Sequence, residues 1–296
     1  MSRALLRLFL ACVLLSQTAY AAVTVAVVDD AQRKITLNKP AQRIISLAPH
    51  STELLFAVGA GTQIVGVSDY SDYPEQAKKI PSVGNIFALD LERVIALKPD
   101  LVVVWGTGNA KLLTSKLRDN HITVFESEPH DFETIATSLE RLAILTGTDA
   151  TGKEAALKFR SRLETLRLSY QLKPGQKTVS VFYQIWQKPL MTLNDKHLVS
   201  SAIRLCGGTN IFGNMKEISP TVNLEAVLSL NPQAIIASSG EKQDVLADWS
   251  QFPRLFAVNK SNLFIIDGNW INRSGPRILD GVESLCKNLN IARSRL

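Results

Sequence analysis

Residues Leu91–Trp105 read LERVIALKPDLVVVW, and residues Leu224–Ser238 read LEAVLSLNPQAIIAS. Leucine, glutamate, valine, leucine and proline recur at the same places, with a constant offset of 133 residues. Each copy has the pattern of a short helix, a turn at Pro99 or Pro232 and an apolar strand. The chain therefore contains a duplicated unit of helix and strand.

Three further pairs of segments match in the same order around this unit. They are GTQIVG at 61–66 and GTNIFG at 208–213, the predicted opening strands Arg43–Leu47 and Lys177–Val181, and the predicted late strands Ile122–Phe125 and Leu263–Ile266. We therefore predict an α/β fold with two similar lobes. Alternating strands and helices imply that each lobe has a parallel sheet with helical crossovers.

The stretch between the two halves has the composition of one long helix. Asp149–Tyr170 contains no proline, and its only glycine is Gly152. Its apolar residues recur at spacings of three and four, and Lys173-Pro174-Gly175 ends it. A flexible linker would be rich in glycine and serine, so we expect a stiff connection. We predict an N-terminal lobe over 22–148, a connecting helix over 149–172, a C-terminal lobe over 173–296, and a ligand cleft between the lobes.

Residues 1–21 have the parts of a secretory signal peptide. Arg3 and Arg7 supply the positive start, and Leu8–Leu15 is an apolar stretch too short to span a bilayer. Ala19-Tyr20-Ala21 is a cleavage site. We predict a protein exported to the periplasm with this segment removed; an uncleaved anchor or a lipoprotein is the alternative.

Charge and composition exclude several classes of protein. The net charge of +6 falls to +4 without Arg3 and Arg7, and no run of five like charges occurs, so nucleic-acid binding is not expected. A hydrophobic content of 46% with 20% charged residues is ordinary for a globular protein. Collagen, long disorder and coiled coil are therefore excluded.

Two cysteines remain once Cys12 leaves with the signal peptide. Cys206 and Cys286 are an even pair in an oxidising compartment, and they are 80 residues apart. We predict a disulfide between them; two buried free thiols are the alternative.

Short motifs give no support for catalysis. Gly147–Lys153 nearly matches a phosphate-binding loop, but Glu154 stands where a magnesium-binding hydroxyl belongs. No G-x-S-x-G elbow occurs, and the four histidines show no paired metal spacing. We predict a binding protein with no catalytic residues, no metal site and no cofactor of its own. A secreted hydrolase, or a periplasmic sensor without a transporter, is the alternative.

Four stretches resemble the periplasmic cobalamin-binding proteins of ABC importers, within the wider class that binds corrinoids, haem and ferric siderophores. They are SLAPHSTELLFAVGAG, GVSDYSDYPEQAKKIPSVG, LERVIALKPDLVVVW and SGPRILDG. The resemblance implies two Rossmann-like lobes joined by one rigid helix, a monomer that binds cobalamin or a related corrinoid, and delivery to a permease–ATPase complex. A haem or ferric-siderophore ligand is the alternative, and the cysteine pair also fits the pattern.

The resemblance is incomplete where the ligand should lie. Cobalamin binders of this type have a tryptophan in the stretch that here reads Gly84-Asn85-Ile86-Phe87. A second family tryptophan falls on Ser219, and a ligand-contacting acid aligns with Asn269. The resemblance therefore implies the ligand class while leaving the exact ligand open.

A large, flat ligand needs broad aromatic walls and a few polar anchors. Five further residues are candidates for contact with the ligand, and packing in the core or on the surface is the alternative for each. They are Tyr183, Asn109, Asn269, Asn272 and His50. The predicted ligand-binding residues are Tyr70, Tyr73, Phe87, Trp105, Trp186, Trp270 and Arg273.

Glu92 and Glu225 occupy the same position in the two copies of the duplicated unit. A carboxylate in the first turn of a helix interacts favourably with the helix dipole. This interaction alone could explain the presence of either glutamate, and it is the alternative to a docking role. In the family that the sequence resembles, these glutamates pair with arginines of the permease. We predict that both dock on a two-fold symmetric partner.

Overall fold

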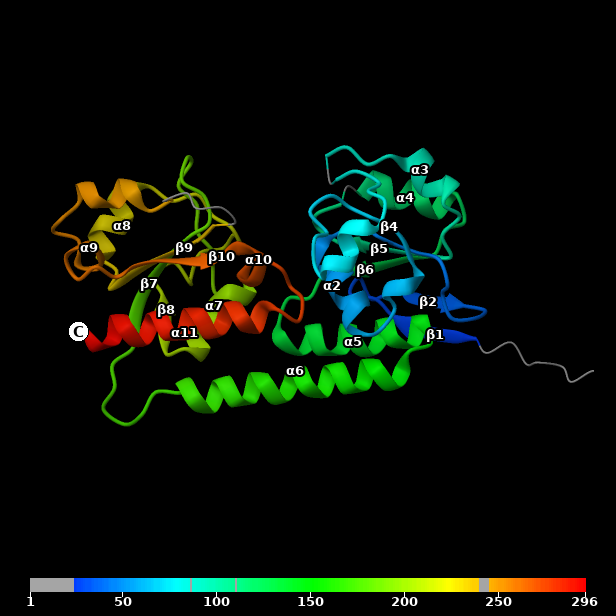
Figure 1. The fold of residues 1–296 in the computed structure, drawn as a ribbon. Helices are drawn as coiled ribbons and strands as arrows, with labels where there is room; N and C mark the ends of the chain where they lie inside the picture. Colours follow the sequence, from blue (N-terminus) through cyan, green and yellow to red (C-terminus); the bar gives the residue numbers. More distant parts are fainter. Residues whose placement is uncertain (1–23, 86, 110, 240–244) are drawn as a thin grey trace, which may run out of the picture.

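A computed structural model describes residues 24–85, 87–109, 111–239 and 245–296. The chain folds into two α/β lobes above one long helix (Figure 1), as predicted. The N-terminal lobe contains β3 (Ile44–Ser46), α2 (Pro49–Ala57), β4 (Ile64–Val67), α3 (Leu91–Ala96), β5 (Leu101–Trp105), α4 (Lys111–Asp119), β6 (Val124–Ser127) and α5 (Phe132–Thr146). The C-terminal lobe contains β7 (Val179–Gln184), α7 (Leu198–Leu205), β8 (Gly208–Asn210), α8 (Leu224–Leu230), β9 (Ala234–Ser239), α9 (Phe256–Asn259), β10 (Leu263–Asp267), α10 (Gly268–Ile271) and α11 (Ile278–Ser294).

The two sheets have the same strand order. In the N-terminal lobe the order is β4-β3-β5-β6, and in the C-terminal lobe it is β8-β7-β9-β10. All neighbouring strands in these two sheets are parallel. The duplicated sequence unit forms α3 with β5 in one lobe and α8 with β9 in the other, so the repeat predicted from the sequence is a repeat of structure.

The connecting helix α6 spans Asp149–Tyr170, the stretch whose composition indicated one long helix, and it ends two residues before the predicted boundary at 172. It lies under both lobes (Figure 1), packs along α5 and also contacts α11. Gly152 allows a close approach to α5, because a Cβ at this position would overlap the Ala143 side chain. Phe159 and Ala156 bury their side chains in the core, which joins the helix firmly to the lobes.

A hairpin of β1 (Val25–Val28) and β2 (Lys34–Leu37) precedes the repeat, and the sequence analysis did not predict it. The strands are antiparallel and four residues long. Burial alternates along β2, where Ile35 and Leu37 face the core. Strands this short give little periodic signal, and α5 packs on β1 to supply the missing apolar contacts.

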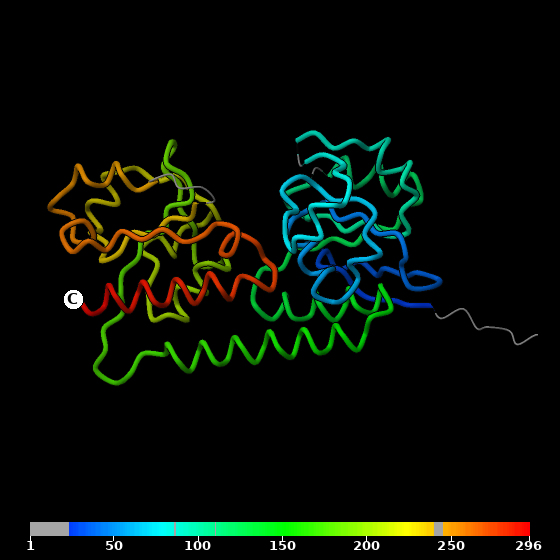
Figure 2. The backbone as a smooth tube through the Cα atoms, in the orientation of Figure 1, coloured from blue at the N-terminus to red at the C-terminus, as the bar shows by residue number. Residues whose placement is uncertain are grey.

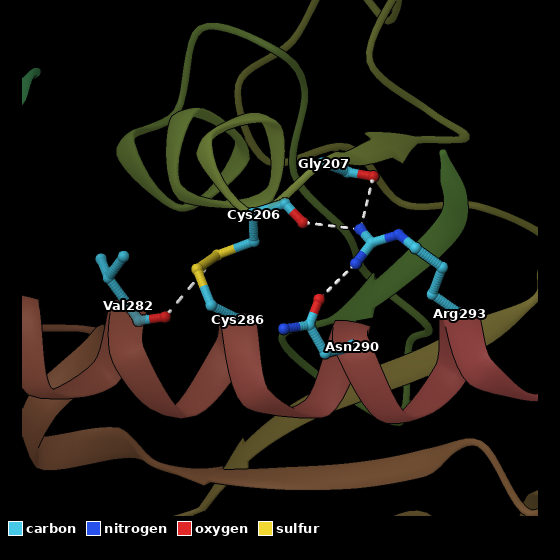
Figure 3. The surroundings of a disulfide bond; sticks show 6 residues. All are labelled: Cys206, Gly207, Val282, Cys286, Asn290 and Arg293. Carbon is cyan, nitrogen blue, oxygen red and sulfur yellow. Dashed lines mark hydrogen bonds between the residues drawn. A yellow bond between two sulfur atoms is a disulfide. The ribbon is translucent and has the colours of Figure 1, made fainter. Parts of the chain in front are cut away.

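The predicted disulfide between Cys206 and Cys286 is confirmed (Figure 3). It joins the end of α7 to the middle of α11 and is fully buried. Arg293, two turns further along α11, donates to the backbone oxygens of Cys206 at 2.8 Å and Gly207 at 3.1 Å. The covalent bond and these hydrogen bonds together fix α11 against the C-terminal end of α7.

The expected signal peptide, residues 1–21, lies outside the described residues. Among the residues that the structure does describe, no helix is both long and apolar enough to cross a membrane.

Candidate functional site: a cleft between the lobes

A cavity of about 280 Å³ lies between the two lobes. The N-terminal lobe contributes Trp105 from the end of β5 and Glu128 from just after β6. The C-terminal lobe contributes residues after β10. The cavity therefore lies where the carboxyl ends of the strands of both sheets meet, as expected for α/β sheets. Its lining is Pro49, His50, Trp105, Glu128, Pro129, His130, Lys196, His197, Leu198, Ile218, Ile271, Asn272, Arg273, Ser274 and Ile278.

Two larger hollows, of about 530 and 550 Å³, lie near the C-terminal end of α6. Neither is lined by a residue predicted to bind ligand, and both lie by the amino ends of strands, beside β7 and β8, rather than at the carboxyl ends. Position, rather than volume, therefore identifies the cleft between the lobes as the candidate site.

Trp105 lies in the cleft in a fixed orientation. Its indole Nε1 donates to Glu128 Oε1 at 3.2 Å, and its ring forms a T-shaped contact with the His50 ring, with centroids 6.0 Å apart. Its backbone nitrogen donates to Asn109 Oδ1 at 2.7 Å. Asn109, a predicted polar anchor, is buried, and its side-chain oxygen holds this backbone.

Two uncharged histidines line the cleft. Burial lowers the pKa of His50 to about 4, although a hydrogen bond to the Ser127 backbone opposes the shift. Burial also lowers the pKa of His197 to about 4, and its Nδ1 accepts from the Val199 amide at 3.1 Å. Both rings are neutral at pH 7, so they offer the cleft polar edges without positive charge.

A buried ionic cluster joins the two lobes beside the cavity. Glu53 of α2 has a side chain only 1% exposed. It accepts from Arg277 Nη2 at 2.5 Å and Nε at 3.0 Å, and from Arg273 Nη1 at 3.1 Å. Figure 2 shows the segment that carries both arginines, between α10 and α11, reaching toward the N-terminal lobe.

Arg273, a predicted ligand-binding residue, lies in the lining of the cleft, but its Nη hydrogens all donate to groups of the protein. Nη1 donates to Glu53 and to Asp72 at 2.7 Å. Nη2 donates to the Tyr70 carbonyl at 3.2 Å and to Asn269 Oδ1 at 2.8 Å. The guanidinium therefore bridges the lobes, a role that the sequence analysis did not assign to it.

The other predicted aromatic residues lie outside the lining of this cavity. Phe87 is 91% exposed, Tyr70 is 78% exposed and Trp186 is 62% exposed. Tyr73 is also exposed, and Arg277 stacks over its ring at 3.8 Å. Trp270 is half-buried in α10, beside the bridging segment. Tyr183, in contrast, is fully buried in the core, so the expectation that it lies in the cleft was wrong.

Glu92 and Glu225 are both exposed, and each lies in the first turn of its helix. The caps are equivalent as well: Asp90 accepts from the Arg93 amide, and Asn223 accepts from the Ala226 amide, both at 2.8 Å. Helices α3 and α8 lie on the side of the molecule away from α6 (Figure 1). The repeat therefore places two like charges on equivalent surfaces of the two lobes.

The sequence analysis missed the charged residues Glu53, Glu128 and Arg277, and it also did not predict His197 in the lining. Glu53 carried a usable signal, because it directly precedes the apolar run Leu54–Ala57, and a carboxylate buried beside such a run needs a charged partner. Arg277 and Glu128 gave no comparable signal, since a charged residue in a loop is ordinary.

Comparisons with known proteins agree with this architecture. The chain is 38% identical over 260 residues to the vitamin B12-binding protein of Vibrio cholerae, with 86% of this chain and 92% of that protein covered. It is 37% identical over 251 residues to the vitamin B12-binding protein of Yersinia pestis, with 84% and 86% covered.

Solved structures give the same result. The periplasmic vitamin B12 binding protein BtuF of Vibrio cholerae matches with a TM-score of 0.78 at 38% identity, covering 86% of this chain and 98% of that one. The heme-binding protein BhuT, in complex with two hemes, matches with a TM-score of 0.75 at 20% identity, covering 84% and 98%; this is a likeness of fold alone. Residues 44–269 match the periplasmic binding protein family, and the chain belongs to that family.

Proposed function

We propose that the chain binds cobalamin or a related corrinoid between its lobes and delivers it to an ABC importer. The observation that carries this proposal is a cleft at the strand ends of a duplicated fold in a chain 38% identical to a vitamin B12-binding protein over 86% of its length. The chain acts in the periplasm as a monomer after removal of residues 1–21. It performs no catalysis.

The charges in the cleft favour a corrinoid over the alternative ligands. Haem carries carboxylates, and many ferric siderophores are anionic, so such ligands need free cations. Arg273 is committed to the protein, and His50 and His197 are neutral. Among the residues that the structure describes, Lys196, on the rim, is the remaining Lys or Arg in the lining of this cavity. A corrinoid, whose periphery carries amides, requires polar edges rather than positive charge.

A corrinoid is larger than the cavity of about 280 Å³, so it also contacts the rim. We assign Trp105 as the wall at the base of the site. The exposed rings of Tyr70, Tyr73 and Phe87 cover the ligand from the N-terminal lobe. Trp186 and Trp270 do so from the C-terminal lobe, and Arg273 keeps the two lobes at the required separation.

Delivery uses Glu92 and Glu225. The two exposed carboxylates lie on equivalent helices of the two lobes, which suits a permease with two equivalent arginine-bearing subunits. Because neither glutamate lines the cleft, docking and ligand binding are separable.

Titration of the purified mature chain tests this function directly. Cyanocobalamin, cobinamide, haemin and a ferric siderophore are added in turn, and binding is followed by absorbance and calorimetry. We expect one corrinoid per chain and weaker binding of the other ligands. Saturable binding of haemin without binding of either corrinoid would move the assignment to the haem alternative.

A further inference from the structure

Glu128 makes an unusually complete set of contacts with the end of β5. Besides accepting from the Trp105 indole, its Oε2 accepts from the Thr107 amide at 2.7 Å. The Thr107 hydroxyl lies 3.1 Å from Oε1 and 3.0 Å from Oε2. Three donors, all from Trp105 and Thr107, therefore converge on one carboxylate in the cleft.

The Trp105 ring is restrained on its other sides as well. A Cβ at Gly108 would overlap the six-membered part of the indole, so the ring lies directly against the Gly108 backbone. The Asn109 amide donates to the Trp105 carbonyl at 2.9 Å, which complements the bond from the Trp105 nitrogen to Asn109 Oδ1. Glu128 is the contact that fixes the polar edge of the ring.

We propose that Glu128 is a positioning residue for ligand binding. It holds the half-buried indole in the orientation in which the ring forms the wall of the cleft, and Trp105 makes the contact with the ligand. A ring that is already ordered loses no rotational freedom when the ligand arrives, so its orientation contributes to affinity. The inference rests on the corrinoid-binding function proposed above.

A titration with cyanocobalamin of Glu128→Ala, Glu128→Gln, Trp105→Phe and the Trp105→Phe/Glu128→Ala pair tests the proposal. Loss of a hydrogen bond to a charged group predicts about tenfold weaker binding for Glu128→Ala. Glu128→Gln retains an acceptor for the indole and should recover much of that loss. Phenylalanine has no indole N–H, so Glu128→Ala should add little in the Trp105→Phe background.

Glu126→Ala is the matched control. Glu126 lies two residues earlier, in β6, and its carboxylate pairs with Arg33 and Arg118 rather than with residues of the cleft. We expect its affinity to equal that of the wild type. An equal loss for Glu128→Ala with and without Trp105 would mean that Glu128 contacts the ligand itself, and the positioning role would be rejected.

A second readout needs no ligand. Acrylamide quenching of tryptophan fluorescence is measured in the ligand-free proteins, and the Trp105→Phe variant gives the contribution of Trp105. Glu128→Ala should make Trp105 more accessible to the quencher, and this increase should vanish in the Trp105→Phe background. Unchanged quenching would overturn the positioning role. A wild-type chain that binds no corrinoid would overturn the proposed function alone, since quenching still decides the role of Glu128.

Discussion

The two lobes share one strand order, but their cleft edges differ. Trp105 ends the first copy of the duplicated unit, and the equivalent residue in the second copy is Ser238. On the outer helices the copies agree, because Glu92 and Glu225 keep the same position and equivalent caps. The duplication has therefore been lost where an asymmetric ligand would lie and retained where a two-fold symmetric partner would bind.

The lobes also differ in what stabilises them. The C-terminal lobe contains the disulfide between Cys206 and Cys286. The N-terminal lobe instead adds the β1–β2 hairpin, where the largely buried Asp30 pairs with Arg141 of α5 at 2.7 Å. One lobe is cross-linked covalently, and the other is completed by an extra pair of strands.

Removing the disulfide should produce the largest loss of stability. Cys206→Ser releases a loop of 80 residues, for which chain entropy predicts a loss of about 4 kcal/mol in the free energy of unfolding. Ligand affinity should persist at temperatures where the variant is folded, because neither cysteine lines the cleft. Denaturant unfolding with and without reductant measures the change. A wild-type protein equally stable in both conditions would contradict this account of the C-terminal lobe.

Breaking the buried ionic cluster between the lobes should lower the free energy of unfolding by nearly as much. Glu53→Gln leaves Arg273 and Arg277 without their buried carboxylate, and breaking a buried ion pair costs about 3 kcal/mol or more. The matched control is Glu75→Gln, since Glu75 is exposed and pairs with Lys78 on the surface. Thermal and denaturant unfolding compare the two variants. Equal stability of both would show that the bridge contributes little to holding the lobes together.

A pair of equivalent histidines should make both lobes acid-sensitive. His50 and His197 each lie 11 residues before the matching GTQIVG and GTNIFG segments, and both have a pKa of about 4. An unfolded histidine titrates near 6.5, so the unfolded chain binds more protons between pH 6.5 and 4. The contribution of the two neutral histidines to the free energy of unfolding is therefore complete above pH 6.5, and it is lost as the pH falls toward 4.

For His50 alone this difference is worth up to about 3 kcal/mol. Free energies of unfolding are measured from pH 7 to pH 4 in the wild type, His50→Gln and His197→Gln. Each variant should lose less stability on acidification than the wild type. Parallel curves in all three proteins would mean that other groups determine the acid response.

Substitutions at the equivalent cleft positions of the two lobes should change ligand affinity by different amounts. Trp105→Ala should weaken corrinoid binding by about 1–3 kcal/mol, the usual value for a buried aromatic contact. Ser238→Ala, at the equivalent position of the second copy, is the control and should change affinity much less. Calorimetry on both variants tests the difference between the lobes. If Trp105→Ala and Ser238→Ala bound the corrinoid with similar affinity, Trp105 would have a structural role only.

The repeat, the connecting helix and the disulfide were predictable because each leaves a pattern in the sequence itself. The repeat is visible as matching segments, the helix as apolar periodicity, and the disulfide as an even pair of cysteines after a signal peptide. The helix bounds Asp149–Tyr170 follow from periodicity and from the Pro174-Gly175 stop. The bridge from Glu53 to Arg273 was not predictable, because its partners are 220 residues apart and meet only when the lobes are assembled. For the same reason, Tyr183 and Trp105 looked alike in sequence, although one is core and the other lines the cleft.

Substitutions of the equivalent glutamates on α3 and α8 should have the smallest effect of all, and they test whether the symmetry of these helices serves docking. Glu92→Ala and Glu225→Ala should leave ligand affinity unchanged, because both carboxylates are exposed and lie outside the cleft. Each should lower the free energy of unfolding by less than about 1 kcal/mol, the usual contribution of a first-turn carboxylate to the helix dipole. Exposed charges act mainly through the rate of association, so each variant should dock on the reconstituted transporter more slowly at low salt. Each should lose about 1 kcal/mol of docking free energy or less, and the double variant should lose more than either single one. Binding of ligand-loaded protein at two salt concentrations measures this. If the double variant docks like the wild type at both, the two glutamates serve only as helix-start residues, and the repeat at this surface records common ancestry of the lobes rather than a shared partner.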